Sequence, residues 1–297
     1  MKPFLPRLNQ LAVLLSAFVL LVLSGCAAVQ VNSVTAQLPK DFPQQSFSHQ
    51  AFEDLLQRFV VNNRVDYDAW HADPQAIAQL NSYLAAVAAY SPDNAPERFR
   101  NKNDGKAYWL HIYNALVIKA VLDHWPLASV NDVKAPLEIV QGYGFFYRLG
   151  FIVGGQTLNL YDIEKEKVLK QWSDPRAHFV LNCASASCPV IRPSLPTGDA
   201  LEPHLVKATQ EFISDPHNVN INHQAKQLHL SRIFDWYQAD FINDLRRRSV
   251  PAPNGIVDYL IDAAPASLKP ELQKSIAYKI NYVDYDWALN KATPSKP

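Results

Sequence analysis

Several residue types are scarce in this sequence, and each scarcity narrows the classes of protein to consider. The 297 residues include only 9 glycines and 1 methionine, which argues against a loop-rich protein and against the methionine-lined surfaces of promiscuous binders. Neither sign of charge predominates, because 28 Lys and Arg balance 28 Asp and Glu. A net charge of zero gives no indication of a nucleic-acid partner or of a strongly acidic one. The hydrophobic share of 48% is ordinary for a globular protein.

The N-terminus has the pattern of an export signal. Lys2 and Arg7 precede an apolar run over residues 11–23, and the small residues Ser24 and Gly25 stand directly before Cys26. A charged start, an apolar run and small residues before a cut are typical of a secretory signal peptide, here residues 1–25. The run is shorter than the roughly 20 apolar residues that span a bilayer.

Cys26 at this place resembles the lipobox cysteine of bacterial lipoproteins. The resemblance implies lipidation of Cys26 and anchoring through several acyl chains, which together hold a protein stably on a membrane. The alternative is an ordinary secreted protein in which Cys26 has no special role. Lipoproteins of this kind without Asp after the cysteine usually reach the outer membrane, and Ala27 follows here. We therefore expect a lipid-anchored protein of the cell envelope, on the outer membrane and facing the periplasm.

The rest of the chain is predicted to form one α+β domain. We expect a lipidated tether over residues 26–47, a single domain over 48–290 and a disordered tail over 291–297. The domain should be mostly helical, with a small antiparallel sheet and a central buried helix whose apolar residues lie in the segment 108–121. Helical spacing of apolar residues predicts helices at about 48–60, 74–89, 104–124, 161–170, 201–212, 234–244 and 256–263. Extended segments are expected at 151–153 and 157–160, where Gly154 and Gly155 between them indicate a hairpin. A second hairpin is expected at 219–222 with 227–231, and further extended segments at 178–182 and 279–285.

Cys183 and Cys188 remain as an even pair once Cys26 is assigned to lipid. In an oxidising compartment such a pair often forms a disulfide. Two thiols without a second Cys/His pair at ligand spacing are weak evidence for zinc, so neither a metal nor a cofactor is expected. If residues 178–182 form a strand, Cys183 shares a face with Phe179 and Leu181, and such apolar surroundings would make the thiol inert.

Other polar residues stand on segments that otherwise have the character of a core. Asn114 lies in the middle of the predicted central helix, where it requires a hydrogen-bonding reason, either a tie to a nearby loop or contact with a ligand. Glu164 near a helix start could cap that helix or belong to a site. Arg176 could pair with a nearby carboxylate or bind a ligand carboxylate or phosphate. Trp236 and Tyr237 are most simply core residues.

Several motifs in order along the chain resemble the domain-of-unknown-function 547 family. The most specific is His178-Phe-Val-Leu-Asn-Cys-Ala-Ser-Ala-Ser-Cys-Pro189, and further matches lie at residues 108–116, 160–164, 233–237 and 284–287. The resemblance implies a fold and a site, not a reaction. In the family a histidine usually follows the residue that matches Glu164, whereas this chain has Lys165.

Two functions from different classes remain open. The first is a non-catalytic envelope module in which Asn114, Glu164, Arg176 and Asn182 bind a peptide, a glycan or an envelope protein, and no nucleic acid. The second is a cysteine-dependent hydrolase or acyl-transfer enzyme. There Cys183 or Cys188 would be the nucleophile and His178 the base, with Asn182 orienting the base or donating to an oxyanion. In either case we expect Asn114, Glu164, Arg176, His178, Asn182 and Cys183 to surround one concavity.

Overall fold

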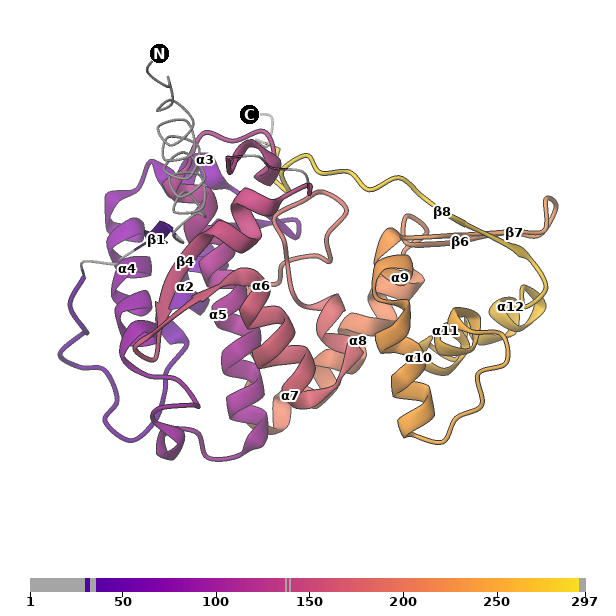
Figure 1. The fold of residues 1–297 in the computed structure, drawn as a ribbon, viewed down its shortest axis with the longest axis horizontal. Coiled ribbons are helices and arrows are strands. Elements are labelled where there is room, and N and C mark those ends of the chain that lie inside the picture. The colour runs from indigo at the N-terminus through magenta and orange to yellow at the C-terminus, as the bar shows by residue number, and fades with distance from the viewer. Residues whose placement is uncertain (1–29, 33–35, 137, 139, 294–297) are drawn as a thin grey trace, which may run out of the picture.

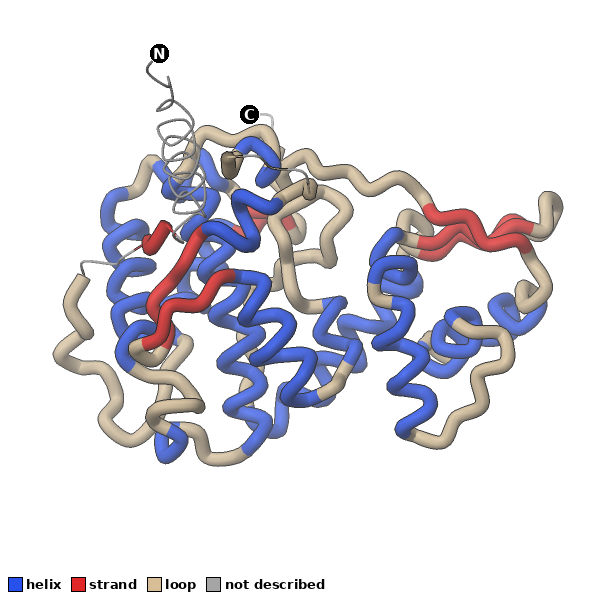
Figure 2. Tube along the Cα trace, viewed as in Figure 1, coloured by secondary structure: helices blue, strands red, loops and turns tan. Residues whose placement is uncertain are grey.

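The computed structural model describes residues 30–32, 36–136, 138 and 140–293. The predicted signal peptide, Cys26 and the last four residues of the predicted tail lie outside this part. Within it, no helix is both long and apolar enough to cross a membrane. The fold is mixed α+β and mostly helical, as predicted (Figure 2).

The first hydrophobic cluster surrounds the long helix α5 (Lys102–Asp123). Helices α3 (Tyr67–His71) and α4 (Pro74–Ala89) contact α5, and α2 (Gln50–Phe59) packs on both of them. The prediction of a central buried helix is confirmed, and α5 is buried on all sides from Asp104 to Tyr113. Such a helix forms part of the core itself and is not amphipathic.

Two antiparallel hairpins are present where they were predicted, and each is extended by a parallel strand. Strands β4 (Leu149–Val153) and β5 (Gln156–Asn159) turn at Gly154 and Gly155, whose φ angles of 55° and 80° suit a two-residue hairpin loop. The backbone N–H of Gly154 donates to the carbonyl of Val87 at 2.9 Å, so the turn docks on the end of α4. The parallel neighbour of β4 is β1 (Gln30–Asn32), within the segment expected to be a tether.

The second cluster contains the helices that follow residue 200 (Figure 1). Its sheet contains the antiparallel hairpin of β6 (Val219–Asn222) and β7 (Gln227–Leu230), and β8 (Lys279–Tyr282) pairs in parallel with β7. After β8 the chain runs back to the first cluster, where Leu289 is buried. A short hairpin, β2 (Val60–Val61) with β3 (Arg64–Val65), completes the strands. The helices that contribute to the second cluster are α8 (Leu201–Ser214), α9 (Arg232–Trp236), α10 (Gln238–Arg247), α11 (Ile256–Ala263) and α12 (Lys269–Lys274).

The expected strand at residues 178–182 is wrong. The chain forms a 3-10 helix at Pro175–Phe179 and then an irregular segment. Asp174 accepts a hydrogen bond from the N–H of Arg176 at 3.0 Å, and proline in the first position suits a helical turn. Phe179 and Leu181 therefore do not share a face as a strand would require, because Phe179 packs in the second cluster and Leu181 in the first.

Candidate functional site

A cavity of about 470 Å³ lies where residues of the two clusters meet. This volume falls in the range of small-molecule sites. Aromatic side chains from several separate segments line much of it: Tyr113 of α5, Tyr147, Tyr161 of α6 (Leu160–Asp162), Trp236 of α9, Tyr285 and Trp287. We call this the aromatic cavity.

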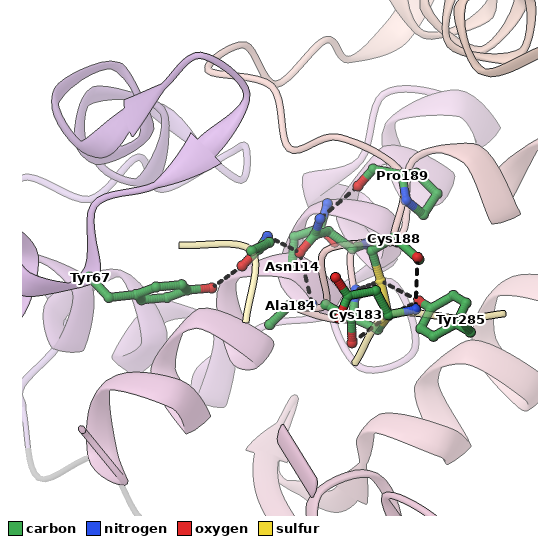
Figure 3. Close-up of a disulfide and its surroundings, with 12 residues drawn as sticks. Tyr67, Asn114, Cys183, Ala184, Cys188, Pro189 and Tyr285 are labelled. Carbon is green, nitrogen blue, oxygen red and sulfur yellow. Dashed lines mark hydrogen bonds between the residues drawn. A yellow bond between two sulfur atoms is a disulfide. The ribbon is translucent and has the colours of Figure 1, made fainter. Parts of the chain in front are cut away.

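A disulfide forms part of the wall of the aromatic cavity. Cys183 and Cys188 are joined with a Cα–Cα distance of 6.0 Å, and both line the cavity. The hydroxyl of Tyr285 lies 3.0 Å from Cys183 Sγ and 3.1 Å from Cys188 Sγ (Figure 3). Cys188 and Tyr285 also line a second cavity of about 920 Å³. The disulfide loop therefore separates the two cavities.

Asn114 and Asn182 hold the disulfide loop from within the protein. The Asn114 amide donates to the carbonyl of Val180 at 2.9 Å and accepts from the N–H of Asn182 at 2.8 Å. The Asn182 side chain donates to the carbonyl of Pro189 at 2.6 Å and accepts from the N–H of Ala184 at 2.9 Å. Asn182 is only 2% exposed. Neither residue lines the aromatic cavity, and the amide of Asn114 is a tie to a neighbouring loop.

Glu164 lies in the aromatic cavity and does not cap its helix. The helix begins at Leu160, and Asn159 and Asp162 cap it reciprocally. Glu164 and Lys165 lie in the π-helix Ile163–Leu169 that follows, a rare geometry that is frequent at functional sites. Because Asp162 fills the capping role, the Glu164 carboxylate is not needed at the helix start.

The Glu164 carboxylate already has two partners in the cavity. It accepts from the Lys165 ammonium at 2.9 Å and from the hydroxyl of Tyr237. The Lys165 nitrogen also lies 4.5 Å from the centre of the Tyr237 ring, a cation–π contact. Burial, and secondarily the neighbouring Glu164, raises the pKa of the Tyr237 hydroxyl, which stays protonated as a donor.

His178 lines the same cavity but is engaged away from the sulfurs. Its Nε2 atom lies 2.9 Å from a carboxylate oxygen of Asp240. Its ring stacks on Tyr237 with centroids 3.7 Å apart. The hydrogen bonds found among the described residues include none from His178 to Cys183 or Cys188. The Asp240 carboxylate therefore orients the imidazole, and both cysteine sulfurs are joined in the disulfide.

Arg176 lies outside the aromatic cavity, in a cluster of ion pairs. Its guanidinium binds Asp174 at 2.7 Å and Glu202 at 2.5 Å, and the Lys106 ammonium also contacts Asp174. Burial opposes ionisation of Asp174, but the hydrogen bond from Arg176 and the charge of Lys106 hold the pKa of Asp174 well below its usual value. With both carboxylates bound, Arg176 is a structural ion-pair partner here.

The structure thus brings only part of the expected set into one concavity. Glu164, His178 and Cys183 line the aromatic cavity together with Cys188, whereas Asn114, Asn182 and Arg176 do not. Trp236 was expected in the core and is instead 49% exposed. Tyr285 and Trp287 were missed as site residues, although both lie in a motif that carried the family resemblance. Polar and titratable residues indicate a site in a sequence, whereas aromatic residues such as Tyr285 and Trp287 indicate a core.

In the part of the chain that the structure describes, no group of three His, Cys, Asp or Glu side chains could hold a metal ion.

Comparison with known proteins gives a family match for one part of the chain. No curated protein and no solved structure matches the chain. Residues 96–213 match the model of the family described as "Protein of unknown function, DUF547". The matched segment includes Glu164 and the disulfide but ends before Trp236. Over residues 96–213 the chain is therefore similar to this family, as the sequence motifs indicated.

Proposed function

We propose that this protein is an envelope lipoprotein that binds a small ligand in the aromatic cavity. One observation carries the proposal: aromatic walls enclose about 470 Å³ around a carboxylate and an ammonium group that are bonded to each other. Binding sites commonly combine an apolar lining with a few placed polar groups. The second cavity fits this pattern less well, because few aromatic rings and several charged side chains, Arg192 and Glu211 among them, line it.

The disulfide has a structural role in this proposal. The bond from Cys183 to Cys188 closes the loop that forms one wall, and the Asn182 side chain fastens the same loop at Pro189 and Ala184. A wall fixed at both ends loses little conformational freedom when a ligand binds, which favours affinity. This reasoning favours binding over cysteine chemistry.

The anchor is the second half of the proposal and rests on the sequence. Cys26 precedes Gln30, the first residue of β1, by four positions. A fully extended chain of that length reaches about 14 Å. A lipid on Cys26 would therefore hold the first hydrophobic cluster, to which β1 is tied through β4, close to the membrane surface.

A cysteine-dependent enzyme is the second candidate, and one observation favours it. His178, oriented by Asp240 at 2.9 Å, lines the same cavity as both sulfurs, although it bonds to neither of them. A base with its orienting group is one part of the arrangement that activates a nucleophile. The enzyme would require reduction of the disulfide by an external dithiol. A thiol count on unfolded mature protein, before and after dithiothreitol, separates the candidates. Two thiols before reduction would favour the enzyme, and none would favour the binding module.

Saturation-transfer NMR with a fixed panel of phenol, indole, glucose and N-acetylglucosamine tests ligand binding in the aromatic cavity. We expect at least one compound to bind the wild type and to lose its signal in Trp236→Ala. The ring is half exposed, so its removal should leave the fold intact. Ile276→Ala is the control, because Ile276 is a 40% exposed apolar residue that does not line the cavity. The proposal is wrong if no compound binds, or if binding is the same in Trp236→Ala as in the control.

A further inference from the structure

We propose that the ligand of the aromatic cavity is a neutral pyranose sugar, free or as a unit of a glycan. The inference rests on the function proposed above and adds the chemical class of the ligand. Three properties of the cavity lead to it: the grouping of its rings, its charge balance and its hydroxyl groups.

Two groups of contacting rings line the cavity, in addition to Tyr237 stacked on His178. Trp236, Tyr285 and Trp287 contact one another, with centroid distances of 4.7 Å between Tyr285 and Trp287 and 4.8 Å between Trp236 and Tyr285. Tyr147 and Tyr161 stack at 4.4 Å. The C–H side of a sugar ring can pack on the face of a single aromatic ring. Trp236, at 49% exposure, presents its ring to an arriving ligand.

The charges of the cavity favour a neutral ligand. Among the described residues that line it, the only Asp, Glu, Lys or Arg side chains are Glu164 and Lys165, bonded to each other at 2.9 Å. His178 is occupied by Asp240. A cationic ligand would meet the Lys165 ammonium, and an anionic one would meet Glu164. A zwitterionic peptide would have to break the pair and desolvate both groups, which costs free energy.

The hydroxyl groups of the cavity argue against a purely apolar ligand. Tyr113, Tyr237 and Tyr285 all line it. The Tyr237 hydroxyl donates its proton to Glu164 and the Tyr285 hydroxyl lies beside the sulfurs, but each hydroxyl oxygen can still accept a hydrogen bond from water or a ligand. An apolar ligand would remove water from these groups and from the Glu164–Lys165 pair without replacing its hydrogen bonds. A pyranose has apolar faces for the rings and hydroxyls at its edge for the polar groups.

Saturation-transfer NMR titrations with neutral trisaccharides test this class directly. The probes are maltotriose, cellotriose and chitotriose, with indole and triglycine as the planar and zwitterionic alternatives. We expect at least one trisaccharide to bind the wild type, and Trp236→Ala to raise its Kd about tenfold. Trp236→Phe keeps a ring and should stay within about threefold of wild type, and Ile276→Ala should be unchanged. Glu164→Gln should also weaken trisaccharide binding, because it replaces one carboxylate oxygen by an NH2 donor and removes the negative charge opposite Lys165.

The outcomes separate this inference from the proposal on which it rests. Binding of indole or triglycine that depends on Trp236, without any trisaccharide binding, would overturn the sugar assignment and leave a ligand-binding cavity. Trisaccharide binding that neither Trp236→Ala nor Glu164→Gln alters would place the sugar elsewhere and overturn the assignment as well. If none of the five probes binds, both the sugar and the cavity lose their support.

Discussion

The side-chain amide of Asn290 donates a hydrogen bond of 2.9 Å to the side-chain oxygen of Asn182, which precedes it by 108 residues. The oxygen of the Asn290 side chain in turn accepts from the hydroxyl of Tyr67 at 3.0 Å. These contacts tie the returning C-terminal segment to the disulfide loop and to α3 (Figure 3). The segment that supplies Tyr285 and Trp287 to the aromatic cavity is fixed at this point.

We expect Asn290→Ala to lower the free energy of unfolding by about 1–3 kcal/mol, because it leaves buried partners without a hydrogen bond. Denaturant unfolding of the purified protein measures the change. Asn220→Ala, on the exposed face of β6, is the control and should change stability by less than about 0.5 kcal/mol. Equal losses of unfolding free energy in the two variants would show that the hydrogen bonds of Asn290 do not stabilise the protein.

The ion pairs around Asp174 give a second prediction. Asp174→Asn should destabilise the protein by about 3–5 kcal/mol, because Lys106, whose side chain is 7% exposed, would retain a buried charge without its partner. Glu202→Gln removes a carboxylate that is 56% exposed and should cost less than about 1 kcal/mol. Urea unfolding at neutral pH compares the two variants. A larger loss for Glu202→Gln would contradict the assignment of Asp174 as the centre of the cluster.

Buried histidines give a pH dependence with a definite sign. Burial, opposed by a hydrogen bond to the carbonyl of Pro196, lowers the pKa of His111 from 6.5 to about 4. Burial also lowers the pKa of His49, whose ring lies 4.9 Å from that of His111. Because the unfolded chain binds these protons first, stability is full above pH 6.5 and falls as the pH drops toward 4.

For His111 alone, the loss by pH 5 is about 2 kcal/mol. Urea unfolding at pH 7.5 and pH 5 measures it in the wild type and in His111→Gln, where the dependence should be smaller. His217→Gln is the control, because the side chain of His217 is 91% exposed. Stability that rises from pH 7.5 to pH 5 would contradict the account. The low pKa of Asp174 acts in a separate window, since its contribution is lost only below about pH 4.

The anchor predicts a location. The mature protein should fractionate with the outer membrane and require detergent for release. Cys26→Ser should give unprocessed or soluble protein, because the substitution removes the lipidated thiol. Mass spectrometry of the N-terminal peptide would show the acyl chains directly. Wild-type protein recovered from the periplasm without detergent would contradict the prediction.

Much of the fold was predictable because its signals are local. The bounds 74–89 and 256–263 agree with α4 and α11, and Gly154-Gly155 correctly indicated a hairpin turn. Strands β1 and β8 pair in parallel with partners far along the chain, and no local pattern specifies such a partner. The strand at 178–182 was wrong because the helix-starting residues Asp174 and Pro175 outweighed the alternation of the residues after them.

The candidate site was predictable only in part, for a physical reason. Cys183, Cys188, Glu164 and His178 were identified because thiols and titratable groups in an apolar context indicate chemistry. An asparagine in an apolar context also suggests a site, even when its role is to hold a loop in place, as Asn182 does here. Trp236 is exposed in the structure, yet an isolated tryptophan in a sequence indicates a core.

A crystal structure of the protein soaked with the most tightly binding compound of the phenol, indole, glucose and N-acetylglucosamine panel tests the central claim most directly. The account predicts electron density for that compound in the aromatic cavity, in contact with Trp236 and within hydrogen-bond distance of Glu164 or Lys165. Density in the second cavity beside Arg192, with the aromatic cavity holding only water, would contradict it.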